Sequence, residues 1–499
     1  MSVIEGTPIG EAATPATGLT GLRERTPSRA VKLAYGVGEI CQSTHYNANG
    51  FVFFFYTAVL GLPGSLVGLA LFFGLFFDAA VDPVLGSVSD NLRTRFGKRL
   101  PLMLVGGPLM ALCFALVFAP PPELAMPLLF GWLALTSVAT RVFLSVYYVP
   151  YVALGAELAT GYVERSSVVA YRTVFGILTG VIVTALAYSV FFSGERGGLQ
   201  AAANYGPFGW AMFVLATLPA VACCIWLRRY AASLPNEVQV GTALHRRFMG
   251  ELREVFRNHS FRVVFFASVL FWTAQGLHGT LNAHAYVFVW KLSSAQIQTI
   301  TYAFLAGFLL GVPLTPLLLR RVEKRTAVLL GLTVLVVSQL VLGSLWAAGL
   351  FRPEGAQAAA VLSANVFLAG IGVAFAAIAL PSMMADAADE HEEQFGRRRE
   401  GMYFAGLGFS TKAATGVGTL AAGLALDLLR FPANTAAAET AAVPADALQR
   451  LVLAWGPFAA VVTFGCVLTL AAYRITRARH AEIAAELRRR SGGEPAPAE

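Results

Sequence analysis

The sequence predicts an all-α membrane protein with twelve transmembrane helices. Of its 499 residues, 56% are hydrophobic and only 13% are charged, whereas a soluble globular domain is about 25% charged. Apolar stretches of about 20 residues, enough for a helix to cross a hydrocarbon core of about 30 Å, recur along the whole chain. We expect helices at residues 33–60, 65–90, 101–120, 125–157, 168–193, 208–228, 261–290, 296–318, 326–349, 357–385, 401–428 and 451–474.

Basic residues predict the orientation of these helices. Lysines and arginines cluster before helix 1, after helices 2, 6, 8 and 10, and after helix 12, whereas the alternate loops hold few. By the positive-inside rule, we expect both termini in the cytoplasm and the protein in the cell inner membrane. The net charge of +8 then follows from topology, and we expect no binding to nucleic acid.

The longest polar stretch between helices divides the chain into two halves. The predicted organisation is a disordered N-terminal arm (1–30), a six-helix bundle (31–229), a basic cytoplasmic linker (230–260), a second six-helix bundle (261–475) and a cytoplasmic tail (476–499). Two such bundles are typical of the major facilitator fold, whose binding site lies near the midplane between the halves. The basic turn at 93–99 has a counterpart at 320–325, six helices later.

Two carboxylates, Asp78 and Asp82, interrupt the second predicted helix. Four residues apart, they project from one helical face about 6 Å apart along the axis. An ionisable group at bilayer depth costs at least about 2.5 kcal/mol, and two carboxylates in a low dielectric repel each other. They therefore require a proton, a cation such as Na⁺ or a basic side chain nearby. Permanent structural ion pairs are the alternative explanation.

Basic side chains are available in other predicted helices. Arg141 lies in helix 4, Arg172 in helix 5 and Lys412 in helix 11. Together with Glu39 in helix 1 and the two aspartates, they make a predicted buried inventory of three acids and three bases. So close a balance would allow a site to exchange one cation for an internal ion pair during a transport cycle, which is our hypothesis for Asp78 and Asp82.

Polar and aromatic side chains mark candidate substrate-binding faces. Arg141, Ser145 and Tyr148 recur at i, i+4 and i+7, so they share one face of helix 4. Aromatic planes with a few directed donors suit sugar-like or amphipathic ligands, although tyrosines in a helix also serve packing.

The first and seventh predicted helices carry similar polar bands. Gln42, Ser43 and Tyr46 belong to the band in helix 1, and His278 belongs to the band in helix 7. Such residues either line a cavity or bind helices to one another. Their recurrence in both halves favours the cavity, and we include all four in the predicted substrate site.

Two charged segments lie at the predicted cytoplasmic ends of helices. After helix 2, Asp90, Arg93, Arg95 and Arg99 are expected to pair with nearby acids and helix C-termini as a gate latch; an ordinary positive-inside loop is the alternative. The acidic run at 386–393 is expected in a cytoplasmic loop, as a solvated, salt-bridged cap rather than a metal cluster.

The motif D-x-x-x-D-P-x-x-G at 78–86, the run G-R-R-R-E-G-M-Y-F-A at 396–405 and Lys412 beyond it resemble those of the glycoside-pentoside-hexuronide:cation symporters. This is the melibiose-carrier branch of the major facilitator superfamily, and the resemblance covers residues 31–475. It implies cation-coupled uptake by alternating access, with Asp78 and Asp82 at the cation site, Lys412 as the helix 11 lysine and Arg172 in the sugar pocket.

The chain departs from the melibiose carriers at the sugar-binding acids. Gln42 and Ser43 replace a Lys-Asp pair in helix 1, and Tyr148 replaces an aspartate in helix 4. The resemblance therefore does not imply galactoside recognition. Arg141 favours a ligand with a carboxylate, such as a uronide, or a lysolipid-like solute. A helix 4 contributor to the family's cation site is also missing, which leaves H⁺ and Na⁺ open.

We therefore expect a symporter that couples Na⁺ or H⁺ to movement of a sugar, glycoside or uronide. The alternatives are a symporter of an amphipathic lysolipid-like solute and an uncoupled facilitator or sensor of the same fold. An enzyme is not expected, because the seven histidines lack metalloprotease-like spacing. The expected partners are a small-molecule substrate, the coupling cation and the bilayer. We expect no cofactor, no metal other than Na⁺ at the aspartates, and function as a monomer.

Overall fold

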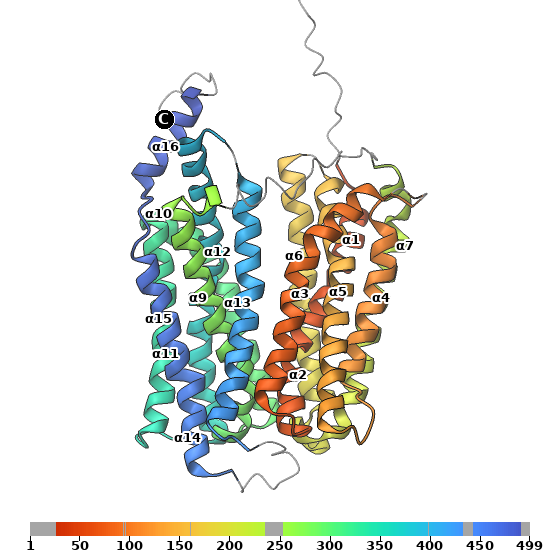
Figure 1. Cartoon of the computed structure of the whole chain (residues 1–499), viewed down its shortest axis with the longest axis vertical. Coiled ribbons are helices and arrows are strands. Elements are labelled where there is room, and N and C mark those ends of the chain that lie inside the picture. Colours follow the sequence, from red (N-terminus) through yellow and green to blue (C-terminus); the bar gives the residue numbers. More distant parts are fainter. Residues whose placement is uncertain are drawn as a thin grey trace, which may run out of the picture.

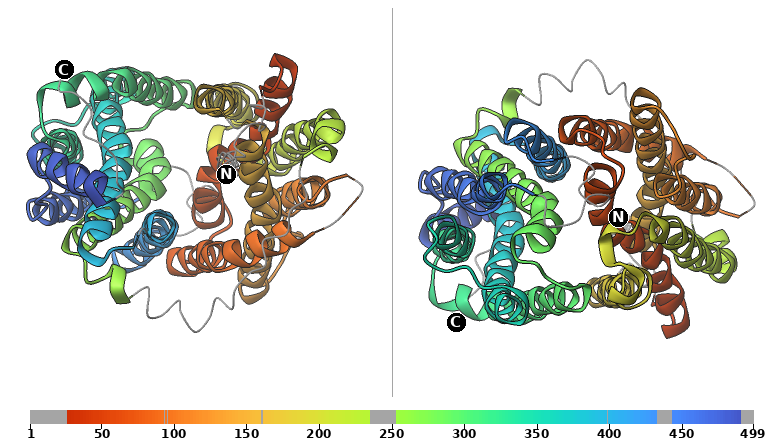
Figure 2. Two further views of the ribbon diagram at one scale, coloured as in Figure 1. Left: turned by 90° about the horizontal axis from the view of Figure 1, so that it is seen from above. Right: turned by 90° about the horizontal axis from the view of Figure 1, so that it is seen from below.

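The protein folds into two helical bundles that stand side by side (Figure 1). The computed structural model describes residues 26–92, 94, 96–159, 161–234, 253–397, 399–432 and 443–490. All regular secondary structure in these ranges is helical, which confirms the predicted all-α fold. Seen along the helices from either end, the bundles remain two distinct groups (Figure 2).

Six membrane-length segments make up the N-terminal bundle. Its main elements are α1 (Arg29–Ala48), α2 (Gly50–Phe54) and the π-helical turn η1 (Phe55–Val59), which follow one another, then α3 (Gly64–Asn91), α4 (Leu100–Val117), α5 (Met126–Leu158), α6 (Tyr162–Ala185) with η2 (Leu186–Phe191), and α7 (Tyr205–Ala232). The predicted helix 5 thus begins six residues too late, because the polar first turn of α6 lies outside its apolar stretch.

The C-terminal bundle repeats this plan. Its elements are α9 (His259–His284) with η6 (Ala285–Val289), α10 (Ser294–Arg321), α11 (Lys324–Ala347), α12 (Gly355–Phe395), α13 (Glu400–Leu428), and α14 (Ala445–Leu453), η8 (Ala454–Phe458) and α15 (Ala459–Leu470) in succession; α16 (Arg477–Arg490) follows outside it. Much of the predicted linker and N-terminal arm lies outside the described residues.

The same pattern of backbone hydrogen bonds follows α2 and α9, which shows the internal repeat. In η1 the amide of Leu60 donates to the Phe55 carbonyl, and the amide of Leu62 donates to the Tyr56 carbonyl. In η6 the amides of residues 290 and 292 donate to the carbonyls of residues 285 and 286 with the same two spacings. Both turns lead into the next long helix, α3 or α10, so the two halves share one connection as well as one helix order.

Ten helical segments among the described residues are long and apolar enough to span a membrane. The two other segments of the predicted twelve, residues 29–59 and α13, stand among them in their bundles (Figure 1). Their lower hydropathy follows from the polar side chains that they carry, such as Glu39, His45 and Lys412. Each predicted helix range falls on one of these twelve segments.

The prediction of a loop at 386–393 is wrong. These residues form the last two turns of α12, because alanine and glutamate are strong helix formers and no breaker precedes Gly396, which ends the helix at φ 68°. Asp386 is buried and accepts from Lys324 Nζ at 2.8 Å through both carboxylate oxygens. The segment is nevertheless a salt-bridged cap, since Arg479 of α16 pairs with Glu393 at 2.5 Å.

The bundles touch at one end, which we call the outer end; the inner end is the end at which α1 begins and α16 lies (Figure 1). One cluster of buried apolar side chains runs through the N-terminal bundle and continues into the outer part of the C-terminal bundle. There, Thr57 Oγ1 lies 2.9 Å from His284 Nε2 of the other bundle. Both oxygens of Asp427 accept from α3, from the amides of Gly64 and Ser65 at 2.8 Å. The outer end is therefore closed in this structure.

Candidate transport site

Asp78, in the middle of α3, lies at the centre of a charged cluster. Its residue surface is 3% exposed. Its Oδ1 accepts a 2.6 Å hydrogen bond from Ser145 Oγ, and its Oδ2 lies 3.8 Å from Nη1 of Arg141. Both partners project from the face of α5 that the sequence predicted. The spacing of four residues on α5 thus places one donor and one positive charge on a single carboxylate.

Lys412 reaches this cluster from the other bundle. Its Nζ lies 3.2 Å from Asp78 Oδ2 and 2.5 Å from Asp82 Oδ2. The side chains of Lys412 and Asp82 are each about a third exposed, whereas that of Asp78 is covered. With Arg141, the cluster holds two acids and two bases, so its formal charge sums to zero. The two aspartates thus accept an ion-pairing partner from each bundle.

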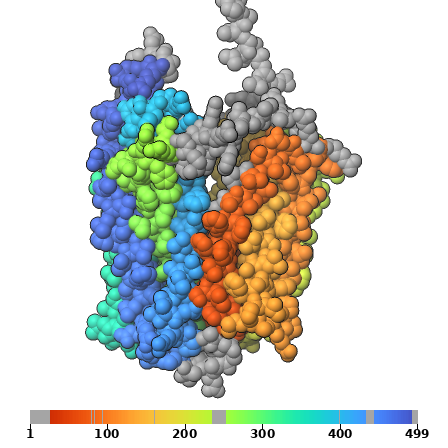
Figure 3. Space-filling model, viewed as in Figure 1, coloured from red at the N-terminus to blue at the C-terminus, as the bar shows by residue number. Residues whose placement is uncertain are grey.

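Helices α3 and α13 pack together from the outer end inward as far as this ion pair. The backbones meet at Gly64 and Gly423, and Gly416 lies against the side chains of Phe72 and Leu75 one level further in. Figure 3 shows α13 in contact with α3 over this half of the molecule. Glycines permit the close approach that brings an ammonium group on one helix to carboxylates on the other.

A second charged group lies within the N-terminal bundle. Glu39 of α1 is buried, and its Oε2 lies 3.9 Å from Nε of Arg172 on α6. Ser43 Oγ, one turn further along α1, donates a 3.4 Å hydrogen bond to Oε1. Tyr148 of α5 lies within electrostatic range of both charged groups. The structure thus gathers three predicted substrate-site residues around Glu39. The substrate site predicted from the sequence does not include Glu39.

The remaining predicted substrate residues occupy different surroundings. Tyr46 is 70% exposed and lies near Arg141, whereas Gln42 is partly buried beside Ser43. His278 packs within the C-terminal bundle, where its Nδ1 lies 2.7 Å from the Trp455 carbonyl and its ring stacks on that indole at 4.9 Å. For His278 the structure therefore favours helix packing over ligand contact.

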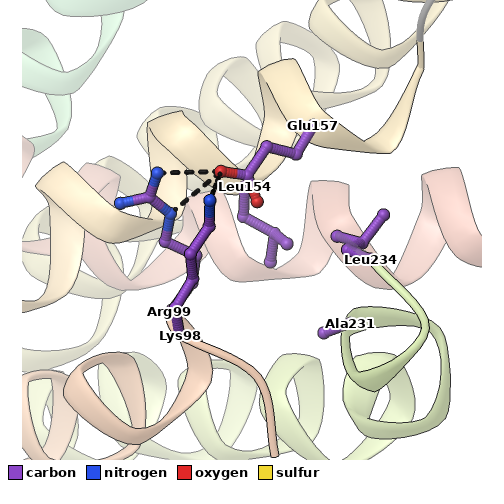
Figure 4. A pocket seen from close by; sticks show the side chains of 6 residues that line it. All are labelled: Lys98, Arg99, Leu154, Glu157, Ala231 and Leu234. Carbon is purple, nitrogen blue, oxygen red and sulfur yellow. Dashed lines mark hydrogen bonds and ion pairs between the residues drawn. The ribbon is translucent and has the colours of Figure 1, made fainter. Parts of the chain in front are cut away.

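Arg99, directly before α4, contacts both α3 and α5, and Figure 4 shows its contact with Glu157 of α5. Its Nε and Nη2 donate to Glu157 of α5 at 3.2 and 2.8 Å, and Lys98 approaches the same carboxylate at 3.1 Å. Nη2 also lies 2.6 Å from Asp90, and Nη1 donates to Ser89, both on α3. These contacts all lie within the N-terminal bundle, so they tie α3, α4 and α5 together rather than one bundle to the other. Residues 93 and 95, the other predicted latch arginines, lie outside the described residues.

The C-terminal bundle has the matching contact. Arg99 directly precedes α4, and Lys324 is the first residue of α11, the equivalent helix of the second half. Their carboxylate partners, Glu157 and Asp386, lie near the inner ends of the equivalent helices α5 and α12. The basic turns that suggested a repeat in the sequence are thus equivalent in three dimensions.

The family model described as MFS/sugar transport protein matches residues 33–477. This chain belongs to that family. The membership confirms the major facilitator fold, the resemblance to the sugar symporters and the prediction of a transporter rather than an enzyme. The transporter is a multi-pass membrane protein with a small-molecule substrate.

Three relatives of the transporter align over most of its length. An uncharacterized symporter of Synechocystis, sll1374, is 26% identical over 92% of this chain and 96% of its own. The isoprimeverose transporter of Lactiplantibacillus pentosus is 25% identical over 81% of each chain. The mouse sphingosine-1-phosphate transporter MFSD2B is 25% identical over 84% of this chain and 86% of its own.

A solved structure shares the transporter's fold. A bacterial homolog of the human lysosomal transporter Spinster, in an inward-facing and unoccupied conformation, superposes with a TM-score of 0.61 at 12% identity. The match covers 94% of this chain and 98% of that chain. At this identity the likeness shows the fold alone.

Proposed function

We propose that the transporter is a cation-coupled secondary symporter that moves a sugar, glycoside or uronide across the cell inner membrane by alternating access. Asp78 and Asp82 form the site of the coupling cation, Na⁺ or H⁺. The proposal depends on one observation, the bridge from Lys412 of one bundle to both aspartates of the other. A bridge at this position links occupancy of the carboxylates to the contact between the bundles.

The coupling follows from competition for the same oxygens. A cation bound at Asp78 and Asp82 repels the Lys412 ammonium, which lies within 3.2 Å of both carboxylates. Cation binding therefore weakens the contact between α3 and α13 at Lys412, where this contact ends on the side of the inner end. A ligand shifts a conformational equilibrium only through its different affinity for the two states, and competition with Lys412 provides that difference. In the absence of the cation, Lys412 keeps the carboxylates neutralised.

The substrate occupies the polar surface of the N-terminal bundle near these charges. Arg172 and Tyr148 come from α6 and α5, and Tyr46 and Gln42 come from α1, with Arg141 beside Tyr46. Guanidinium groups and phenols suit the hydroxyl and carboxylate groups of glycosides and uronides. The alignment with an isoprimeverose transporter supports a glycoside. We further propose cytoplasmic termini, function as a monomer and no cofactor besides the coupling ion.

Two observations support other candidates. The alignment with a sphingosine-1-phosphate transporter supports a symporter of amphipathic, lysolipid-like solutes. The internal charge balance of Asp78, Asp82, Arg141 and Lys412 supports an uncoupled facilitator, because the two acids are already neutralised without an external cation.

Transport by proteoliposomes tests these candidates. Gradients of Na⁺ or H⁺ are imposed separately, and uptake of glycosides, uronides and lysolipids is measured for wild type, Asp78→Asn and Asp82→Asn. We expect one gradient to drive accumulation in wild type and neither to do so in the variants. Asp446→Asn removes a solvent-exposed carboxylate and serves as the control. Uptake that is independent of both gradients and equally fast in wild type and in the aspartate variants would contradict the coupling and favour the facilitator.

A further inference from the structure

Among the described residues of the N-terminal bundle, Glu39 and Asp78 are the buried acids, and Glu39 is the less fully neutralised of the two. Asp78 has Ser145 at 2.6 Å, Lys412 at 3.2 Å and Arg141 at 3.8 Å. Glu39 has one base, Arg172, at 3.9 Å, and the single hydrogen bond from Ser43 is long at 3.4 Å. Its Oε2 is buried and accepts no hydrogen bond. A buried carboxylate oxygen without a donor incurs a large desolvation cost, which binding of a proton removes.

The surroundings of Glu39 contain one cation and several neutral groups. The titratable side chains that face it from α1, α5 and α6 are Tyr35, Cys41, Tyr148, Tyr151 and Arg172, and α7 contributes Cys223 and Cys224 beside Cys41. Phenols and thiols are largely uncharged at neutral pH, so Arg172 is the charge that balances Glu39. Loss of the negative charge on Glu39 therefore leaves Arg172 without its counter-ion.

Arg172 is open to a replacement partner. Its side chain is 26% exposed, while that of Glu39 is 10% exposed, so the guanidinium is the more accessible member of the pair. A guanidinium presents several N–H donors; in Arg172, Nε faces Glu39, and the Tyr35 phenol is a further hydrogen-bond partner of the same group. The remaining donors match the two oxygens of a carboxylate or phosphate group.

We propose that the coupling ion is H⁺, that Glu39 binds one proton in addition to the one bound at the aspartate pair, and that protonation of Glu39 releases Arg172 to bind an anionic group of the substrate. The Glu39 carboxylate gains one proton and becomes neutral. The substrate's carboxylate or phosphate then takes its place beside Arg172. The group of charges sums to zero before and after the exchange, so a proton and an anion enter together. This inference rests on the proposed symport and identifies its ion as H⁺ and its substrate class as anionic.

Uptake measurements test the exchange with matched probes. Methyl glucuronide carries the carboxylate, methyl glucoside is its neutral counterpart, and lysophosphatidic acid presents a phosphate. An inwardly directed proton gradient is expected to accumulate at least one anionic probe in wild type and in Glu39→Asp. In Glu39→Gln we expect loss of accumulation with retained exchange of the same probe across the membrane. Arg172→Gln is expected to lose the preference for glucuronide over glucoside.

Glu164→Gln is the matched control. Glu164 also forms an ion pair between α6 and α1, with Lys32 at 2.6 Å, so the substitution removes one charge from the same helix pair. This variant is expected to accumulate the anionic probe as wild type does. Accumulation by Glu39→Gln that equals wild type under the proton gradient would overturn the inference.

Infrared spectroscopy measures the proton itself and does not depend on the choice of substrate. The protonated carboxyl group of Glu39 should give a carbonyl stretching band that grows as the pH is lowered, in wild type and in Glu164→Gln. The band should be missing in Glu39→Gln. Its absence from wild type refutes the inference. If the band is present but no probe accumulates, Glu39 does bind a proton, and the proposed symport of these substrates is wrong.

Discussion

Substitution of Gly423 by alanine tests whether close helix contact holds the outer end closed. A Cβ at this position would lie 2.0 Å from the Gly64 carbonyl oxygen of the other bundle, 2.6 Å from its carbon and 3.2 Å from the Ser65 amide nitrogen. These are backbone atoms of α3, so rotation of a side chain cannot relieve the overlap. Ordinary contacts begin at 3.4 Å, and α13 must therefore move about 1.4 Å away from α3.

The displacement also affects the hydrogen bonds that Asp427 accepts from the first amides of α3. Asp427, one turn along α13, accepts from the amides of Gly64 and Ser65 at 2.8 Å, and a shift of about 1.4 Å stretches both bonds beyond hydrogen-bonding distance. Overpacking costs about 1–3 kcal/mol, and a hydrogen bond to a charged group contributes about 1.5–3 kcal/mol. We therefore expect the closed outer end to lose about 2–4 kcal/mol relative to an open one, which is a change of about 30- to 1,000-fold in their ratio.

Distances between spin labels measure this ratio directly. Labels at Glu195 and Leu350 would sit on exposed outer loops of the two bundles. Cys113, the least buried native cysteine, is replaced by serine in every variant. In Gly423→Ala we expect a new population with a longer distance between the labels.

Gly408→Ala is the control because it lies in the same helix, α13, and its added Cβ meets nothing within 4 Å. Both substitutions increase helix propensity by the same amount, so the comparison removes that effect. If the two folded variants show the same distance distribution as the parent protein, the contact between Gly423 and Gly64 does not determine closure.

Three further predictions concern other contacts. Arg99→Ala leaves Asp90 without its cation and Glu157 with Lys98 alone, so we expect a loss of about 2 kcal/mol in stability, measured by thermal unfolding in detergent. Ser145→Ala removes the 2.6 Å hydrogen bond to Asp78 and is expected to weaken cation binding at least about tenfold, measured as the cation concentration for half-maximal uptake. Ile483→Asp places a charge in the buried contact of α16, so backbone amides of residues 477–490 should exchange faster with deuterium, while those of α15 keep their rates.

The sequence predicts the helices well because the signal for a membrane span is local. Twenty apolar residues form a spanning helix whatever their neighbours are, and the basic loops divide the chain without reference to packing. The prediction failed at the inner end of α12. There the residues are charged, so hydropathy ended the helix near 385, whereas backbone hydrogen bonds continue it to Phe395. Helix propensity, rather than hydropathy, carries the information at such a position.

Contacts between residues on different helices could be predicted less well from the sequence. The i, i+4 spacing correctly predicted that Arg141 and Ser145 share a face, but that Lys412 reaches Asp82 depends on the approach of two helices 330 residues apart in the chain. The same holds for Gly423, whose contact with Gly64 leaves no periodic pattern in either helix alone. Glu39 carried a usable signal, since an acid in the middle of a membrane helix is a functional candidate in its own right.

The predicted inventory of three acids and three bases sums to zero, but this sum does not describe the electrostatics, and Lys412 and Asp82 are each about a third exposed. Asp78 and Asp82 both pair with Lys412 of the opposite bundle, and Asp78 also contacts Arg141 and Ser145 of α5, so the charges of the two aspartates act on the contact between bundles. The pair of Glu39 and its arginine lies within one bundle, at nearly 4 Å and with an oxygen that lacks a donor. Glu39 and the aspartates carry the same formal charge, but their surroundings stabilise that charge to different extents. At the aspartate pair an incoming cation must displace Lys412, whereas at Glu39 a proton removes the cost of a poorly neutralised carboxylate, so geometry rather than net charge distinguishes the two ion sites.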